Sequence, residues 1–142
     1  MTQEEKDLLL KDLCARLSYE IKVAFFNEDL TYHSEPKTLI GVECVNNLNH
    51  SRLEDEDGNT TIIEFVKPYL FPMSSMTEEQ KKEYNFWKHE VPICHYEYGD
   101  VVEEIELFDS PESFEYLIEN HFDYYGLIPM GLALDATGLN IY

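Results

Sequence analysis

Lysine and arginine are missing from the final 54 residues of this 142-residue chain. Residues 89–142 hold 12 acidic side chains and no Lys or Arg, and the formal net charge of the chain is -19. Such a charge repels nucleic-acid phosphates and anionic membranes, so direct binding to either is not expected. A charged partner would be a basic protein. The alternative is that the acidic residues only keep the chain in solution.

Long apolar runs and paired cysteines are absent as well. No apolar run reaches the roughly 18 residues of a membrane-spanning helix. The start MTQEEKDLLLKDLC lacks the pattern of a secretory signal, so we expect a cytoplasmic location. Cys14, Cys44 and Cys94 are 30 and 50 residues apart, which fits neither a disulfide framework nor a CxxC metal site. We expect reduced, mostly buried thiols.

What the chain does contain is enough apolar material for a core. Hydrophobic residues make up 44% of it, with 8 Phe, 10 Tyr and 1 Trp. This composition excludes global disorder despite the charge. The length suits one domain that spans residues 1–142.

The first part of the chain predicts a helix followed by strands. Thr2 and Glu5 match a capping box, and leucines at helical spacing predict a helix over residues 3–17. Alternating apolar residues then predict strands over 20–26 and 38–45.

Residues 53–64, LEDEDGNTTIIE, approach the pattern of a calcium-binding EF-hand loop. With Gly58 at position 6, however, Leu53 occupies position 1, where a carboxylate is needed. We therefore interpret Asp57-Gly58 as a hairpin turn that joins strands 38–45 and 60–66.

The stretch KPYLFPMSSMTEEQ, residues 67–80, combines two prolines with a helix start. Because Pro68 cannot donate a ladder hydrogen bond, strand 60–66 is expected to end before it. Thr77 caps a helix that continues to about His89, with Gln80 as the reciprocal partner. The apolar residues between them form either a crossing that covers the end of a sheet or an exposed docking loop: Tyr69, Leu70, Phe71 and Met73.

The second half predicts a hairpin, a helix and a docked tail. The Gly99-Asp100 pair separates the alternating runs 93–98 and 101–108, which indicates a two-residue hairpin turn. Ser110 caps a third helix with Pro111 at its first position. The apolar C-terminal segment is expected to pack back on the domain.

The predicted fold class is α+β. The elements follow the order α-β-β-β-α-β-β-α, with about five strands in antiparallel hairpins and three helices. The first three strands could also curl into a small barrel.

No catalytic motif stands out. The chain has no phosphate-binding glycine loop and no G-x-S-x-G elbow. Cys94 and His95 are adjacent on a strand and therefore point to opposite faces, although His121 could approach Cys94 from the third helix. Glu103 lies among Val101, Ile105 and Leu107 and could be partly buried, although the favoured interpretation is an edge-strand carboxylate that reaches water. No metal and no cofactor is expected.

Three sequence blocks resemble recurring blocks in a family of small uncharacterised acidic proteins of gut bacteria and of their phages and mobile elements. The blocks are KDLCARL (11–17), VKPYLFPMSSMTEEQKKEY (66–84) and HFDYYGLIPMGLAL (121–134). The resemblance implies a bacterial or phage origin and an intracellular setting. It assigns no activity, cofactor or functional residue.

Three functions remain open from the sequence. The first is a non-catalytic binding or accessory protein whose candidate contact residues are Tyr96, Tyr98, Glu103, Tyr116, Tyr124 and Tyr125. The second is an acidic mimic of nucleic acid that inhibits a basic DNA- or RNA-binding protein, which requires the carboxylates of 97–123 to line one face. The third is an enzyme, which requires Glu103, Cys94, His95 or His121 to converge in a pocket.

Overall fold

The structure is a computed structural model that describes residues 1–45 and 50–142. In this part of the chain the helices are α1 (Gln3–Arg16), α2 (Glu78–Trp87) and α3 (Pro111–Glu119), with short 3-10 turns η1 (Leu17–Tyr19), η2 (Ile63–Phe65) and η3 (Met73–Ser75). The strands are β1 (Lys22–Phe25), β2 (Lys37–Val45), β3 (His50–Asp55), β4 (Thr60–Ile62), β5 (Val66–Leu70), β6 (His89–Glu97), β7 (Asp100–Phe108) and β8 (Leu134–Asp135).

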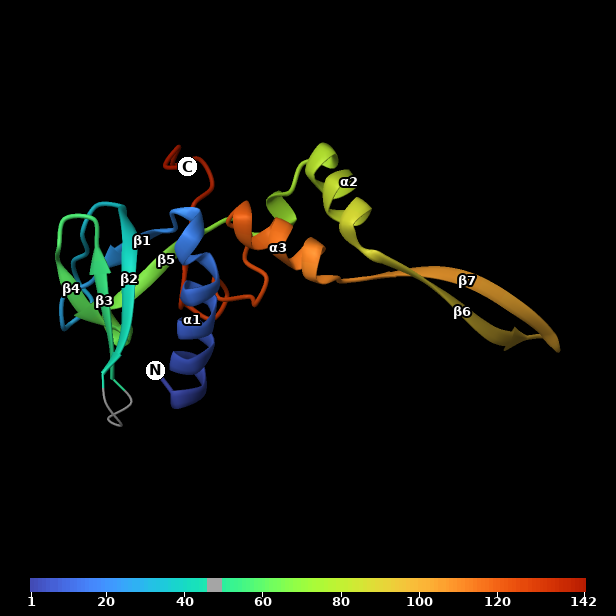
Figure 1. Cartoon of the computed structure of the whole chain (residues 1–142), viewed down its shortest axis with the longest axis horizontal. Coiled ribbons are helices and arrows are strands. Elements are labelled where there is room, and N and C mark those ends of the chain that lie inside the picture. Colours follow the sequence, from blue (N-terminus) through green and yellow to red (C-terminus); the bar gives the residue numbers. More distant parts are fainter. Residues whose placement is uncertain (46–49) are drawn as a thin grey trace.

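Six strands form one sheet in the order β4-β3-β2-β1-β5-β8, and β6 and β7 form a separate two-stranded sheet. All strand pairs are antiparallel except β5 with β8, which is parallel. Helix α1 lies along the six-stranded sheet, whereas β6 and β7 extend away from the rest of the chain (Figure 1). The α+β class is confirmed, and the sheet is mixed because the C-terminal segment adds β8.

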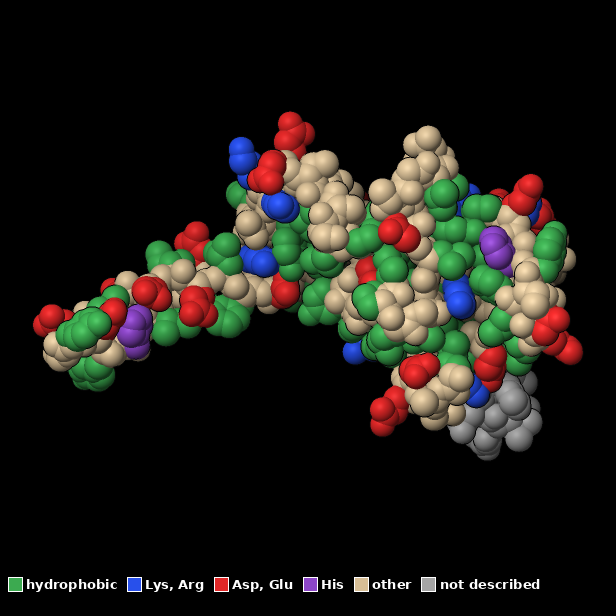
Figure 2. Space-filling view, turned by 180° about the vertical axis from the view of Figure 1, so that it is seen from behind, with side chains coloured by type: hydrophobic (Ala, Val, Ile, Leu, Met, Phe, Trp, Pro, Cys, Tyr) green, Lys and Arg blue, Asp and Glu red, His purple; other side chains and the backbone are tan. Residues whose placement is uncertain are grey.

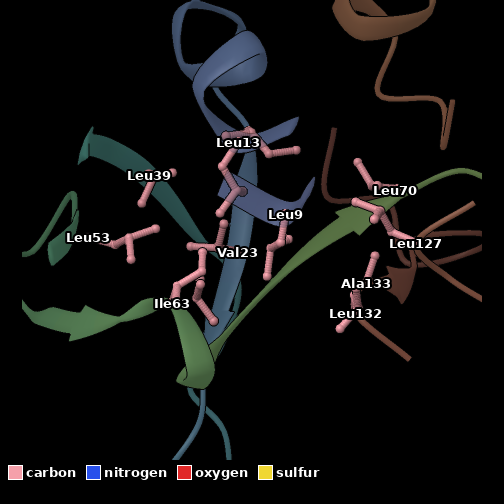
Figure 3. Packing of buried hydrophobic residues seen from close by; sticks show 12 residues of the cluster. Leu9, Leu13, Val23, Leu39, Leu53, Ile63, Leu70, Leu127, Leu132 and Ala133 are labelled. Carbon is pink, nitrogen blue, oxygen red and sulfur yellow. The ribbon is translucent and has the colours of Figure 1, made fainter. Parts of the chain in front are cut away.

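The main core lies between α1, the sheet and the C-terminal segment. Leu9 and Leu13 of α1 point toward Val23 of β1, and Leu127 and Leu132 close the core from the C-terminal side (Figure 3). Each of these side chains is buried. At about 1.5–3 kcal/mol for each large apolar side chain, this burial is the main stabilising contribution to the fold. The predicted docking of the tail is confirmed.

The predicted helix starts are confirmed by their capping hydrogen bonds. The Thr2 hydroxyl accepts a bond from the Glu5 N–H at 3.1 Å. Thr77 and Gln80 form a complete capping box. Ser110 caps α3 through Ser113, with Pro111 at the first helical position.

Two strand predictions were wrong. The Asp57-Gly58 turn joins β4 to β3 and not to β2, because residues 50–55 form a strand that the charged sequence LEDED concealed. Asp55 is buried and its carboxylate accepts the N–H groups of Asp57 and Asn59, which makes it a turn-forming residue.

The single strand expected over 60–66 is divided by η2: β4 ends at Ile62, and a separate strand, β5, begins at Val66 and runs through Pro68 to Leu70. Pro68 faces Val23 across the antiparallel ladder. The Phe26 N–H bonds the Phe65 carbonyl at 2.7 Å, and the alternation of such a ladder then makes Val23–Pro68 a pair without hydrogen bonds, so the proline breaks no bond to β1. The small barrel is not formed by the first three strands, since the sheet has β4 and β8 as its outer strands.

A second apolar cluster joins α2, α3 and the crossing that follows β5. It consists of Met76, Tyr84, Tyr116, Leu117 and Phe122, with Phe71 and Met73 packed against it. Tyr69 and Leu70 are buried. The crossing from sheet to helix is therefore structural, and the alternative of an exposed docking loop is wrong for these residues.

Candidate functional site

Residues 89–108, named the arm below, form a β-hairpin that leaves the body between α2 and α3 (Figure 1). The pairing of Glu97 with Asp100 places Tyr98 and Gly99 in the two-residue turn. Their φ values are 51° and 85°, which a tight hairpin turn requires at both central positions. The predicted hairpin is confirmed, with its turn one residue earlier than expected.

The cross-strand pairs assign the side chains of the arm to two faces. Directly paired residues share a face, so one face carries Glu90, Pro92, Cys94, Tyr96, Val101, Glu103, Ile105 and Leu107. We name it the apolar face, because six of these eight side chains are apolar. The opposite, mixed face carries His89, Val91, Ile93, His95, Glu97, Asp100, Val102, Glu104, Glu106 and Phe108.

Both faces of the arm are open to solvent. Tyr98 at the tip is 99% exposed, Tyr96 is 82% exposed and Ile105 is 67% exposed. Apolar groups and carboxylates alternate along the arm, and it contains no Lys or Arg (Figure 2). A concentration of exposed apolar side chains on a projecting element marks an interaction surface more often than a structural one.

The base of the arm is tied to the body by polar bonds at both ends. The Ser110 hydroxyl donates to the Trp87 carbonyl and so connects the start of α3 to the end of α2. The Tyr84 hydroxyl donates to the Asp109 carboxylate, and burial raises the pKa of this tyrosine well above its ordinary value. Lys88 lies over the Tyr84 ring, 4.2 Å from its centroid. The arm therefore projects from α2 and α3, which these contacts hold together. We name these two helices the platform of the arm.

A hollow of about 310 Å³ lies in this platform between α2 and α3. It is lined by four carboxylates and two aromatic rings: Glu83, Glu112, Glu115, Glu119, Trp87 and Tyr116. Trp87 is the last residue of α2, so the hollow lies beside the root of the arm. The negative charge of the arm thus continues onto the body.

A second cavity of about 480 Å³ lies on the body, between the crossing after β5 and the C-terminal segment. Phe71, Phe122, His121 and Tyr142 are among its lining residues. The His121 and Tyr142 rings stack with centroids 3.8 Å apart. His121 has φ of 63°, at the position after α3 where glycine is usual.

A buried ion pair, Arg16 with Asp12, affects the pKa of a residue that lines this cavity. The Arg16 Nε donates to Asp12 Oδ2 at 2.9 Å, with both side chains fully buried. Burial raises the pKa of Asp12, although the Arg16 guanidinium opposes the shift. Burial, and then the positive charge of Arg16, lower the pKa of His121 to about 4. His121 is therefore neutral at neutral pH.

The predicted contact residues do not form one site. Tyr96, Tyr98 and Glu103 lie on the arm and are exposed. Tyr116 is buried at 8% exposure in the second apolar cluster, where it stacks on Tyr84, so it offers little surface to a partner. Tyr124 and Tyr125 pack edge-on against each other and against Phe114 on the body.

The four residues named for an enzyme site do not come together in the described part of the chain. Glu103 and Cys94 are paired on the arm and both are exposed, so the interpretation of Glu103 as an edge-strand carboxylate that reaches water is confirmed and the alternative of partial burial is wrong. His95 lies on the opposite face, and His121 stacks on Tyr142 in the body. Within residues 1–45 and 50–142, no group of three His, Cys, Asp or Glu side chains could hold a metal ion.

The structure also bears on two other predictions, the burial of the cysteines and the acidic face of a nucleic-acid mimic. Cys14 and Cys94 are exposed, which corrects the prediction of buried thiols; the side chain of Cys44 lies outside the described part. Carboxylates of the arm occur on both faces, since Glu103 is on the apolar face and Glu104 is on the mixed face. Of the five acids in residues 97–108, however, four share the mixed face: Glu97, Asp100, Glu104 and Glu106. Nucleic-acid mimicry therefore stays a prediction.

Sequence reasoning missed several arm-associated residues. Phe86 is 76% exposed and packs edge-on against Trp87 at the end of α2. Val91 and Phe108 are exposed at the root of the arm. Pro92 within β6 was the available signal, because proline in a strand indicates an unpaired edge.

Comparisons with protein-family models, with curated proteins and with solved structures find no match to this chain. Among the described helices, none has the length and apolar character needed to cross a membrane. Function is therefore inferred from the geometry of the chain itself.

Proposed function

We propose that this chain is a non-catalytic binding protein that uses the arm to attach to a basic protein. The observation that carries the proposal is the exposure of apolar side chains on a hairpin that packs against no other strand. An isolated two-stranded hairpin is at best marginally stable in water. A partner that covers the arm would bury these side chains and stabilise it.

The negative charge of the arm determines the sign of the charge that we expect on the partner. Glu90, Glu97, Asp100, Glu103, Glu104 and Glu106 give the arm six acids and no Lys or Arg. The acidic hollow at its root adds four more carboxylates. Opposite charge steers association and selects among partners, so lysine- or arginine-rich surfaces are the favoured targets.

The setting of this function follows from the sequence. The resemblance to small acidic proteins of gut bacteria and their phages supports a bacterial or phage origin and action in the cytoplasm. Attachment to a protein requires no cofactor and no metal.

Fluorescence anisotropy with a labelled basic peptide, Lys-Val-Lys-Thr-Lys-Val-Lys with blocked ends, tests the proposal. The double variant Glu104→Lys/Glu106→Lys reverses two arm charges. The matched control Glu28→Lys/Glu35→Lys makes the same change in net charge at exposed acids of the body. We expect the arm variant to bind at least about tenfold more weakly than the control, a difference of about 1.4 kcal/mol. Equal binding by the two variants would refute the arm as the attachment site.

A further inference from the structure

The hydrogen-bonding pattern of the arm determines which of its edges is free. Glu97 and Asp100 flank a two-residue turn and therefore exchange both backbone hydrogen bonds. Alternate pairs behind them are bonded in the same way. The pairs between those, such as Cys94–Glu103 and Tyr96–Val101, direct their N–H and C=O groups outward to the two edges.

Proline makes the two edges of the arm unequal. Pro92 lies at one of the outward-facing positions of β6, so this edge lacks a donor near its middle. β7 contains no proline, and it directs the N–H groups of Val101, Glu103, Ile105 and Leu107 outward without interruption. Only the edge of β7 presents a complete set of bonding groups.

The two outermost strands of the main sheet are short by comparison. The outer strands of the main sheet are β4, with three residues, and β8, with two. β7 has nine residues. Short edge strands are a usual protection against unwanted pairing, and β7 lacks this protection.

We infer that the basic partner adds an extended strand to the outer edge of β7. This inference rests on the proposed function and names the form that the partner takes. A strand beside β7 places alternate side chains next to Glu104 and Glu106 on the mixed face. Its other side chains lie next to Ile105 and Leu107 on the apolar face. The partner segment is therefore a strand in which Lys or Arg alternates with apolar residues.

A second copy of this chain does not suit this edge. Two β7 strands side by side would bring Glu103, Glu104 and Glu106 close to the same carboxylates of the other copy, with no basic residue on either arm. Like charges on neighbouring strands are destabilising. The carboxylates thus keep copies apart and leave the edge open to a basic strand.

Proline substitutions at one cross-strand pair test the inference. Glu103→Pro removes an outward N–H from β7, whereas Cys94→Pro removes one from β6 at the same distance along the arm. Pro92 shows that the arm accepts proline at such a position. Glu103→Gln removes the same charge as Glu103→Pro but keeps the N–H. We expect Glu103→Pro to weaken binding of the labelled peptide at least about tenfold relative to both Cys94→Pro and Glu103→Gln.

Amide hydrogen exchange in the unmodified chain provides a test that needs no variant to fold. Saturating Lys-Val-Lys-Thr-Lys-Val-Lys should slow exchange at Val101, Glu103, Ile105 and Leu107 and leave Cys94 and Tyr96 unchanged. The rearranged peptide Lys-Lys-Val-Lys-Thr-Val-Lys, which has the same charge without alternation, should bind more weakly.

The two proposals fail differently. Protection on β6 instead of β7, or equal affinity for both peptides, overturns strand addition while the charge-reversal result still supports the arm as the binding element. Concentration-dependent protection of β7 without peptide would show that a second copy occupies the edge and would also overturn it. Loss of the charge-reversal effect overturns both proposals.

Discussion

Breaking the buried Arg16–Asp12 pair is expected to be among the most damaging single changes in this chain. Both side chains are fully buried, and the guanidinium has two polar contacts, Asp12 Oδ2 at 2.9 Å and the Phe122 carbonyl at 2.5 Å. Asp12→Asn preserves the volume of the side chain but leaves a buried positive charge without its counter-ion. Removal of one partner of such a pair costs about 3–5 kcal/mol.

This loss in the free energy of unfolding is large relative to the total stability of a domain of this size, which is typically about 5–15 kcal/mol. With a urea m-value of about 2 kcal/mol/M, the unfolding midpoint should fall by about 2 M. Urea titration followed by circular dichroism at pH 7 measures it.

The double variant Asp12→Leu/Arg16→Met provides the control, because apolar residues of similar volume remove the need for charge compensation. It should be more stable than Asp12→Asn. Two results would contradict the expectation that an unpaired buried charge destabilises the chain. One is a loss of less than about 1 kcal/mol in the free energy of unfolding of Asp12→Asn, and the other is a double variant that is less stable than Asp12→Asn.

Three further predictions concern the body and the platform of the arm. His121→Gly should be about 1 kcal/mol more stable to urea than His121→Ala, because φ of 63° is costly for any residue with a Cβ; equal stability would exclude backbone strain at this position. The pKa of His121, lowered from 6.5 to about 4, means that the unfolded chain binds more protons between these values. The free energy of unfolding should therefore fall as the pH drops from about 6.5 to about 4, and less steeply in His121→Gln; parallel pH profiles would contradict this. Ser110→Ala should lower the free energy of unfolding by about 2 kcal/mol and Thr77→Ala by about 1 kcal/mol, because Ser110 also bonds the Trp87 carbonyl. A larger loss in Thr77→Ala than in Ser110→Ala in thermal melts would refute the tie between α2 and α3.

Local signals predicted the helices and the hairpin because the responsible interactions lie close together in sequence. The caps at Thr77 and Ser110 each involve residues three positions apart. The parallel pairing of β5 with β8 joins Tyr69 to Leu134, and no local pattern records such a pairing. Pro68 was read as the end of a strand because its compatibility depends on the ladder position opposite Val23.

The sequence predicted only part of the candidate site, again because local patterns do not record long-range contacts. Alternation in residues 101–108 indicates a strand with two different faces, but it does not say what covers the apolar one. The structure exposes that face to solvent. The signals that point to exposure are the absence of Lys and Arg, the acids on both faces, and Pro92 on one edge only.

Shortening the arm tests the central claim most directly. Replacing residues 90–107 with an Asn-Gly turn removes the arm but keeps the Ser110–Trp87 tie and both apolar clusters of the body. Because β6 and β7 form a sheet of their own, the shortened chain should keep its free energy of unfolding while losing measurable affinity for Lys-Val-Lys-Thr-Lys-Val-Lys. Undiminished affinity in a folded, shortened chain would contradict the account.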